Sequence, residues 1–346
     1  MSKKKPLLIA AATLALAAVP AVILLAADPK PAKPGGKPDP AVAAAEKERN
    51  AKNTFLDPKA CTPDFLAQGE YVGEAGGKKV AAQVASYGAG DFTVMLFHGG
   101  LPGDGWDGKL SDPIPGKAKD PATAAEVQFG TVATLANGVL KVAEGNVELK
   151  KVERKSPTMG AKPPAGAIVL FGDDKKLDEW NDGHVDDRGL LAAGATTKRK
   201  FKNFTLHGEF ILPFKPYGRD QDRGNSGFYL QKRYEVQVLD SFGTKPVFNG
   251  TGALYRQTPP DLNMCLPPLS WQTYDIDFTS PEFDAAGKKT KNAVITVKLN
   301  GVAVHTNREL TSKTGAGSPE GAEPGPIWLQ GHGNPVFYRN VWIVEK

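Results

Sequence analysis

The chain is dominated by short runs in which apolar and polar residues alternate, and such period-two runs predict β-strands. The clearest run is Tyr234–Asp240. Its alternation places Glu235 and Gln237 on one face of a strand. Val236 and Val238 then lie on the opposite face. The run therefore predicts a polar surface above a packed apolar core.

Two features beside this run affect how its polar face is built. Asn225-Ser226-Gly227 has the composition of a turn, because Asn and Gly tolerate positive φ and Ser caps local backbone groups. Asp240 falls on the apolar side of a regular strand, whereas a β-bulge after Gln237 would turn it toward the polar face. An edge strand with one solvated face fits the same spacing, so the pattern alone leaves both interpretations open.

Similar runs continue from residue 167 to the C-terminus, without a helical period between them. Asn300-Gly301 lies between two of these runs and is a strong hairpin-turn signal. Six or more strands over this length predict a β-sandwich of the jelly-roll kind. The runs are Ile168–Phe171, Asn203–Leu212, Trp271–Phe278, Ala293–Asn300, Val302–His305, Ile327–Gln330 and Val336–Val344.

A first folded unit is predicted at residues 55–154. Its strand-like runs alternate with turn signals such as Gly76-Gly77 and Asn137-Gly138, which is typical of a small antiparallel meander or barrel. The Pro- and Lys-containing segment 155–166 predicts a linker to the second unit. With 38 Gly and 28 Pro in the sequence, we expect an all-β protein with many turns. The runs of this unit are Gly69–Val72, Val80–Ser86, Phe92–Phe97, Val127–Ala133, Val139–Ala143 and Val147–Val152.

Residues 1–27 have the pattern of an export signal, with Lys3-Lys4-Lys5 ahead of an apolar run. Cleavage is expected near Ala26 or Ala27. The apolar run is long, so an uncleaved membrane anchor is the alternative. Residues 28–54 are rich in Pro, Lys and Ala and predict a tether, with a short helix at Ala41–Lys52. We therefore expect a periplasmic, cell-surface or secreted protein that contacts a membrane only if the signal stays attached.

Charge and motifs exclude several classes of protein. The 43 basic and 38 acidic residues give a net charge of +5, and without the three leader lysines 40 basic residues leave +2, so no nucleic acid partner is predicted. The sequence lacks G-x-S-x-G, a P-loop, a dinucleotide fingerprint and H-E-x-x-H. No cofactor is predicted, and the sequence alone leaves a divalent metal open.

Two small sets of residues could form a calcium site or a disulfide. Asp220, Asp222 and Asn225 have the spacing of a calcium loop but lack the EF-hand pattern, so they predict an acidic turn. Cys61 and Cys265 lie one in each predicted unit, and they pair only if the fold brings them within disulfide distance.

Polar residues on the last predicted strands are more informative. Gln330 and His332 share a face with Trp328 if that strand continues through Gly331. Arg339 lies in a strand that is otherwise apolar and aromatic, so its guanidinium must find an acceptor or line a cleft. Taken singly, a salt bridge of Arg339 to Glu235 or Asp240 and a loop position for His332 explain these residues. Taken together, Glu235, Gln237, His332 and Arg339 form an acid–base set with a cation, which favours a functional site.

Six separated motifs of the second unit occur in order and carry a family resemblance. They are Asn225-Ser226-Gly227, Tyr234–Asp240, Thr251–Tyr255, Leu299-Asn300-Gly301, Gly325–Gly333 and Arg339-Asn340-Val341. Over about residues 167–346 the chain resembles the 3-keto-disaccharide hydrolase family, which implies a concanavalin A-like jelly roll with a concave polar face. The first unit is similar to a β-rich module often found ahead of this domain in planctomycete-type proteins. Gly331 stands where family members often carry Asp, which removes one possible orienting partner of His332, and Tyr338 replaces the usual Phe.

The resemblance implies hydrolysis of an oligosaccharide or other glycoside that carries a ketone at C3. The ketone acidifies the C2 hydrogen, a base removes that proton, the C1 oxygen leaves by β-elimination, and water then adds. Glu235 or His332 would supply the base and the acid, and Arg339 would stabilise the enolate charge. The expected substrate-binding residues are Asn225, Gln237, Asp240, Tyr255 and Gln330.

Two other functions fit the same residues. A retaining glycosidase of the jelly-roll β-glucanase type places two carboxylates on one strand, and Glu235 and Asp240 have similar spacing. Gln237, where those enzymes carry Asp, argues against it. A non-catalytic carbohydrate-binding or adhesion module is the third possibility, because a fold alone does not give a function.

Overall fold

The computed structural model describes residues 40–346. The predicted export signal and the start of the predicted tether lie outside the described residues. The predicted helix is present as α1 (Pro40–Lys52). The chain divides into the units Met1–Glu46 and Lys47–Lys346, and all of the strands belong to the second. In the described part of the chain no helix is long and apolar enough to span a membrane.

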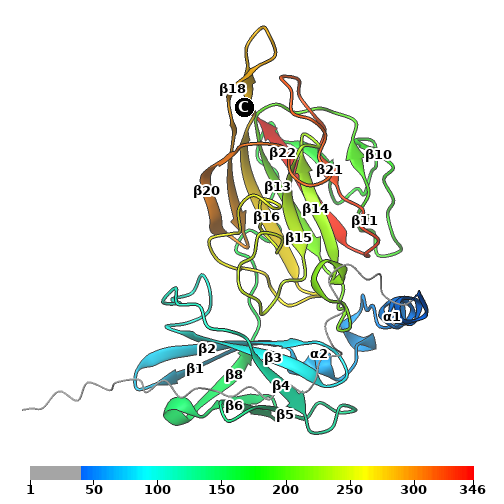
Figure 1. The fold of residues 1–346 in the computed structure, drawn as a ribbon. Helices are drawn as coiled ribbons and strands as arrows, with labels where there is room; N and C mark the ends of the chain where they lie inside the picture. Colours follow the sequence, from blue (N-terminus) through cyan, green and yellow to red (C-terminus); the bar gives the residue numbers. More distant parts are fainter. Residues whose placement is uncertain (1–39) are drawn as a thin grey trace, which may run out of the picture. The chain divides into compact units, whose positions relative to one another are not determined.

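Eight consecutive antiparallel strands form a closed barrel, coloured blue to green in Figure 1. Pairing of Glu70 with Val152 joins the last strand to the first. Alternate residues such as Phe92, Val94 and Leu149 are buried in its core, as the alternating pattern predicts. The strands are β1 (Gly69–Ala75), β2 (Lys78–Ser86), β3 (Asp91–His98), β4 (Ile114–Ala118), β5 (Glu126–Phe129), β6 (Ala133–Ala136), β7 (Val139–Val142) and β8 (Val147–Val152).

Two details of the barrel differ from the sequence prediction. β4 was not predicted, because its sequence Ile-Pro-Gly-Lys-Ala lacks a clear alternation. The predicted strand Val127–Ala133 covers most of β5 and the turn after it, whereas β6 begins only at Ala133; Gly130, at a φ of 54°, turns the chain between the two strands. Short helical turns lie outside the barrel strands: η1 (Pro58–Ala60), α2 (Asp64–Ala67) and η2 (Glu144–Asn146).

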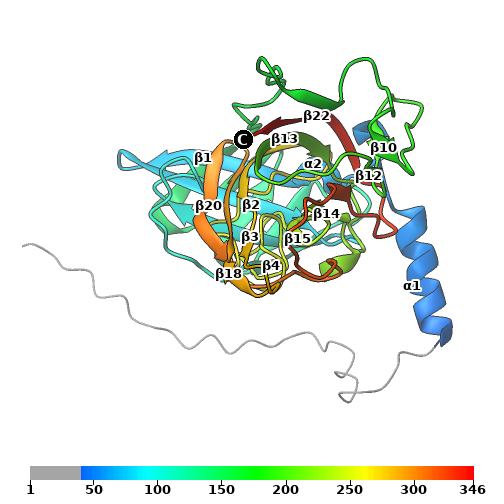
Figure 2. The same cartoon turned by 90° about the horizontal axis from the view of Figure 1, so that it is seen from above.

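The rest of the chain folds as a sandwich of two antiparallel sheets (Figures 1 and 2), which confirms the predicted all-β fold. The five-stranded sheet has the order β10 (Trp180–Asn181), β12 (Thr196–Thr197), β21 (Trp328–Leu329), β14 (Asn225–Leu230) and β15 (Tyr234–Leu239). The seven-stranded sheet has the order β11 (Leu191–Ala192), β22 (Phe337–Glu345), β13 (Phe204–Ile211), β16 (Trp271–Thr279), β19 (Ala293–Leu299) and β20 (Val302–Leu310), with β9 (Ile168–Phe171) also paired to β22. A separate small hairpin joins β17 (Glu282–Phe283) and β18 (Lys289–Lys291).

Aromatic rings from both sheets fill the core between them. Phe228 of β14 packs edge-on against Tyr274 and Tyr338 of the seven-stranded sheet, with ring centroids 5.6 and 5.2 Å away. Val236 and Val238 of β15 are fully buried in the same core, as predicted. Burial of these residues fixes which face of β14 and β15 points away from the core.

The hairpin β14–β15 corrects one prediction. Asn225-Ser226-Gly227 is the start of β14 rather than a turn. The chain instead reverses at Gln231 and Lys232, whose φ values of 53° and 55° are unusual for residues other than glycine. Such a turn carries no Gly or Asn signal and was therefore missed. The Asn300-Gly301 turn joins β19 to β20 as predicted, with φ values of 52° and 79°.

The two cysteines are free. Cys265 is buried in the sandwich core, and burial raises the pKa of its thiol to about 12. Cys61 lies before α2, where its thiol donates to the carbonyl of Asp57. The fold therefore does not join them as a disulfide.

Candidate active site on the five-stranded sheet

The outer face of the five-stranded sheet carries the polar residues that the sequence singled out. Register fixes this face: Glu235 is paired with Tyr229, and Tyr229 with Trp328. Gly227 is paired with Gln237, and its carbonyl accepts a hydrogen bond from the Gln330 N–H. We call this surface the polar face; it carries Asn225, Gly227, Tyr229, Glu235, Gln237, Trp328 and Gln330.

Glu235 lies flat against this face and is only 2% exposed. The Tyr229 hydroxyl donates to its Oε2 over 2.7 Å. Its Oε1 lies above Gly227, where an added Cβ would stand 2.5 Å away. Glycine is therefore required at position 227 for the carboxyl group to reach across β14. This is a stronger reason for the Asn-Ser-Gly motif than a turn.

Burial raises the pKa of Glu235 to about 7, and the hydrogen bond from Tyr229 opposes that shift. The carboxyl group thus exists in both protonation states near neutral pH. A general acid or base works best when its pKa is close to the working pH. Among the residues considered from the sequence, Glu235 has the environment that this role requires.

A short segment, Thr314-Gly315-Ala316, covers the carboxyl group. The Glu235 N–H donates to Thr314 Oγ1 over 2.5 Å, and the Ala316 N–H donates to the Tyr229 hydroxyl over 3.1 Å. A Cβ on Gly315 would stand 3.0 Å from Glu235 Oε2. The segment excludes water from Oε2 and fixes the tyrosine. This segment has no periodic pattern and could therefore not be predicted from the sequence.

Tyr255 is brought to Glu235 by a strand-like extension of the sheet. Leu254 bridges to Val236, and the Tyr255 N–H donates to the carbonyl of Glu235 over 3.3 Å. Tyr255 is half-buried, and no hydrogen bond of its hydroxyl is found within residues 40–346. Its hydroxyl is therefore free to meet a ligand at the edge of the polar face.

Side-chain amides form the part of the polar face beyond Gly227. Gln237 Nε2 donates to Gln221 Oε1 over 3.1 Å, and Asn225 Nδ2 donates to the Gln221 carbonyl over 2.9 Å. Gln221, in the short helix η3 (Asp220–Asp222), was not predicted. Asn225 Oδ1 and Gln330 Oε1 are buried without a partner in the described chain. Buried acceptors are normally satisfied, so these two are suited to hydroxyl groups of a ligand.

Trp328 supplies an aromatic surface beside the acid. Its ring centroid is 4.6 Å from that of Tyr229, and Lys232 Nζ lies 5.6 Å from its centroid. Sugar rings stack on such half-exposed aromatic side chains through their apolar faces. Trp328 was placed on the right face by the sequence, but no role was predicted for it.

His332 lies beyond β21, which ends at Leu329, so the strand does not continue through Gly331 and the condition for His332 to share a face with Trp328 and Gln330 is not met. It is exposed, and its imidazole makes no hydrogen bond to any residue of the described chain. It follows Gln330 by two residues, and Gln330 is bonded to Gly227, over which the Glu235 carboxyl lies. In the chain, His332 therefore follows closely on a residue of the polar face.

The predicted role of Asp240 is wrong. The β14–β15 pairing has no register shift, so the expected bulge is absent. Asp240 is buried and accepts from Arg223 Nε and Nη2 over 3.1 and 2.8 Å. Burying an uncompensated carboxylate would be costly, and Arg223 supplies the compensation. Asp240 is therefore a structural ion-pair partner and not part of the polar face.

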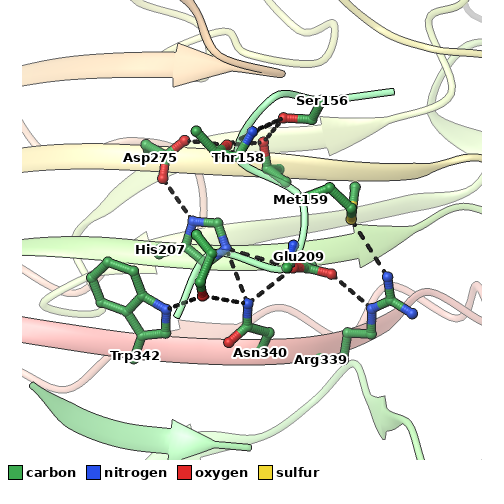
Figure 3. A network of polar contacts seen from close by, with 12 residues as sticks. Ser156, Thr158, Met159, His207, Glu209, Asp275, Arg339, Asn340 and Trp342 are labelled. Carbon is green, nitrogen blue, oxygen red and sulfur yellow. Dashed lines mark hydrogen bonds and ion pairs between the residues drawn. The ribbon is translucent and has the colours of Figure 1, made fainter. Parts of the chain in front are cut away.

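Arg339 is also not on the polar face. It belongs to β22 of the seven-stranded sheet and is paired with Glu209. Its Nε donates to Glu209 Oε2 over 2.7 Å (Figure 3). Its guanidinium lies 3.8 Å from the ring centroid of Trp271. The neighbouring Tyr338 points into the core and meets Ser226 of the opposite sheet. The expectation that Arg339 converges with Glu235 is therefore wrong.

Arg339 instead belongs to a polar network that the sequence analysis did not detect (Figure 3). His207 Nδ1 lies 2.6 Å from Asp275 Oδ1, and Asn340 Nδ2 donates to Glu209 Oε1 over 2.9 Å. Burial raises the pKa of Glu209, but hydrogen bonds from His207, Asn340, Arg339 and the Gly160 N–H outweigh it and lower the pKa to about 2. The predicted linker contacts this network, since Thr158 Oγ1 donates to Asp275 over 2.7 Å.

No group of three or more His, Cys, Asp or Glu side chains is placed to hold a metal ion within residues 40–346. The acidic turn at Asp220 and Asp222 is engaged with the protein itself. Asp222 accepts from Lys215 Nζ over 2.7 Å, and Asp220 accepts from Asn249 over 3.1 Å.

Comparison with known proteins bears on this geometry. Residues 166–344 match the model of the 3-keto-alpha-glucoside-1,2-lyase-like domain, which is slightly more than half of the chain. The chain belongs to this family. The match spans almost the whole sandwich, including β15, which carries Glu235, and its neighbour β14.

Solved structures similar to the chain come from Parabacteroides distasonis and are described as candidate glycosyl hydrolases. One is 36% identical, covers 53% of this chain and 85% of its own, and superposes with a TM-score of 0.49. Two others are 19% and 23% identical, cover 52% of this chain and 94% and 99% of their own, and have TM-scores of 0.39 and 0.37. A comparison with curated proteins gave no match. The family match supports a carbohydrate hydrolase-like function.

Proposed function

We propose that the protein is an exported enzyme that cleaves glycosides oxidised at C3 of one sugar. In the proposed reaction a base removes the C2 proton, the electron pair forms the enolate of the C3 ketone, and the C1–O bond breaks. The leaving oxygen takes up a proton, and water then adds across the new double bond. The observation that carries the proposal is Glu235, a buried carboxyl group with a pKa of about 7 on the polar face.

Glu235 is the proposed base. Its Oε2 is held by Tyr229, while Oε1 lies above Gly227 and points along the polar face. A carboxylate in a poorly solvated position gains more by taking a proton than the same group in water. Proton removal from C2 is the step for which such a group is suited. Positioned acid–base groups contribute about 100- to 10,000-fold to the rate.

Charge that develops on the C3 oxygen needs a hydrogen-bond donor, and Arg339 is too far away to provide it. We assign this role to the Gln330 amide and the Tyr255 hydroxyl. Both groups border the polar face, and neither donates a hydrogen bond to another residue of the described chain. Donors that are already in place at an enolate oxygen stabilise the transition state without reorganisation.

His332 is the proposed proton donor to the leaving oxygen. Its imidazole is exposed and makes no hydrogen bond within the described residues, and it lies two residues after Gln330 of the polar face. Trp328 is proposed to stack against the sugar ring, and Asn225 to accept from a hydroxyl group. Gln237 is already bonded to Gln221 and Asn249, so we assign it the role of holding the amides in place.

The glycosidase of the β-glucanase type is not supported by this arrangement. A retaining enzyme needs two carboxyl groups about 5 Å apart. Asp240 is occupied by Arg223, and no other carboxylate contributes to the pKa shift of Glu235. A single titrating carboxyl group fits proton abstraction better than double displacement.

Incubation of the mature protein with 3-keto-trehalose and with unoxidised trehalose tests the proposal. We expect monosaccharide release from the oxidised substrate alone, because only the ketone acidifies the C2 hydrogen. Saturable binding of both sugars without turnover would instead establish a carbohydrate-binding module. Export is tested separately by recovering the protein outside the cytoplasm and sequencing its N-terminus, which we expect near residue 28.

A further inference from the structure

A cavity of about 470 Å³ lies away from the polar face, where the predicted linker meets the outer side of the seven-stranded sheet. All of its lining residues belong to the unit 47–346. One wall is apolar and aromatic and includes Phe65, Pro267, Pro268, Leu269 and Trp271. This volume is typical of sites for small ring-bearing ligands.

The charged residues that line the cavity carry an excess of positive charge. They are Lys151, Arg154, Lys155 and Arg339, against the carboxylates of Glu70 and Glu153, and the Arg339 guanidinium lies on one face of the Trp271 ring. Glu70 is occupied, because Arg154 donates to both of its oxygens over 2.7 and 2.6 Å.

Two of the remaining cations have little to neutralise them inside the cavity. Lys155 is exposed and makes no ion pair or hydrogen bond within the described residues. Lys151 Nζ donates only to the carbonyl of Leu66, over 2.7 Å. Glu153 alone opposes these two lysines, so a positive charge is left for a ligand.

Two nitrogen donors at the cavity also lack good acceptors. Gln68 is 2% exposed, its Oε1 accepts from the Ser86 N–H over 3.0 Å, and its Nε2 has no partner in the described chain. Arg339 uses Nε for Glu209, but its Nη2 meets only the sulfur of Met159, a weak acceptor, over 3.4 Å (Figure 3). The Gln68 N–H is buried, and a ligand oxygen would satisfy it.

We propose that this cavity binds a small organic carboxylate that carries a ring, with the ring on Trp271 and the carboxylate toward Gln68, Lys155 and Arg339. The apolar wall accounts for the ring, and the unneutralised lysines and unpaired N–H groups account for the anion. An aromatic acid and a uronic acid share this chemistry. The inference does not depend on the activity proposed for the polar face.

Calorimetric titration of the mature protein with benzoate and with glucuronate tests the proposal, with benzyl alcohol and glucose as uncharged counterparts. We expect one carboxylate to bind at about 1 mM or tighter, and its uncharged counterpart to bind at least tenfold more weakly. Binding of benzoate alone identifies an aromatic acid, and binding of glucuronate alone identifies a sugar acid. Absence of binding by both at 10 mM, or equal binding of the uncharged counterparts, would overturn the proposal.

Three variants locate the binding. Trp271→Ala should weaken it about tenfold by removing the ring contact. Gln68→Glu keeps the acceptor for the Ser86 N–H but replaces the free N–H donor by an oxygen. This variant should abolish binding of the carboxylate. Lys155→Gln should weaken it about threefold to tenfold. The matched control is Lys298→Gln, an exposed lysine of β19 outside the cavity, and it should change nothing. Unchanged affinity in Trp271→Ala and Lys155→Gln, both with wild-type melting, would show that the carboxylate binds elsewhere.

Discussion

The hydroxyl of Tyr229 donates a 2.7 Å hydrogen bond to the carboxyl group of Glu235, and the backbone N–H of Ala316 donates to the same hydroxyl. The tyrosine therefore couples a covering segment to the one carboxyl group of the polar face. Burial raises the pKa of the tyrosine itself, so it stays protonated and remains a donor. The hydrogen bond favours the ionised form of Glu235 and limits the effect of burial.

Tyr229→Phe should move the activity profile to higher pH. Without the donor, burial acts alone on Glu235 and its pKa rises above 7, so the acid limb of kcat/KM shifts upward. The Ala316 N–H also loses its acceptor, which should cost about 1–3 kcal/mol of stability. Rates on a 3-keto-disaccharide between pH 5 and 9 provide the measurement. An unchanged acid limb would show that Tyr229 does not tune Glu235.

Gly227→Ala should remove most of the activity and leave the fold intact. The new Cβ would meet Glu235 Oε1 at 2.5 Å and push the carboxyl group off the polar face, whereas the strand backbone at this position suits any residue. Gly321→Ala is the matched control, because its nearest neighbour would be 3.5 Å from the new Cβ. Steady-state rates and melting curves of both variants decide the outcome. Equal activity of the two would contradict the placement of Glu235 above Gly227.

Glu235→Gln should stabilise the protein at alkaline pH. The folded pKa of about 7 lies above the unfolded value, so the wild-type protein loses stability as pH rises from about 4.5 to 7 while the unfolded chain ionises first. A neutral glutamine avoids this loss, and the variant should gain up to about 3 kcal/mol at pH 8 and almost nothing at pH 4. Urea unfolding of the wild-type protein and the variant at pH 4 and pH 8 measures the difference in stability at each pH. A variant that is less stable at pH 8 would refute the raised pKa.

Glu209→Gln should have the opposite effect on stability and no effect on the rate. The folded pKa of about 2 lies below the unfolded value, so the ionised group stabilises the protein above pH 4.5, and this contribution disappears as pH falls toward 2. The variant should therefore be about 2–3 kcal/mol less stable at pH 7. Its kcat/KM should stay within about twofold, because Glu209 lies on the seven-stranded sheet. Loss of activity without loss of stability would indicate that the active site lies on the seven-stranded sheet and would contradict the proposal.

His332→Gln should slow the cleavage of a 3-keto-disaccharide by about 100-fold, since the leaving sugar needs a proton. A 4-nitrophenyl 3-keto-glucoside should be cleaved at nearly the wild-type rate, because nitrophenolate leaves without one. Comparison of kcat for the two substrates isolates this step. An equal loss on both substrates, or on neither, would remove His332 from the proposed role.

The sequence predicted the strands and the polar faces well, because period-two alternation reports directly which side chains of a strand are buried. Val236 and Val238 in the core, and Glu235 and Gln237 on the outside, follow from that pattern alone. Alternation does not say to which sheet a strand belongs. A sandwich has two outer faces, so Glu235 and Arg339 both point outward but on opposite sheets.

The other site residues were predicted wrongly, or not at all, because their partners are distant in the sequence or lie in irregular chain. Asp240 has its cation 17 residues earlier, at Arg223, and no local pattern connects them. The covering segment around Gly315 and the amide network at Gln221 are irregular chain, where periodicity carries no information. The requirement for glycine at position 227 could not be predicted either. It arises because the Glu235 side chain crosses β14 and would clash with a Cβ there.

The central claim, that Glu235 removes a proton from a 3-keto-glycoside, is tested most directly by the initial rate of Glu235→Gln on 3-keto-trehalose. Glutamine keeps the size and the acceptor for Tyr229 but cannot take up the proton. Glu345→Gln, an exposed position at the end of β22, is the control and should keep the wild-type rate. The account predicts a loss of about 100- to 10,000-fold for Glu235→Gln with a cooperative melt retained. A Glu235→Gln rate equal to that of the control would contradict it.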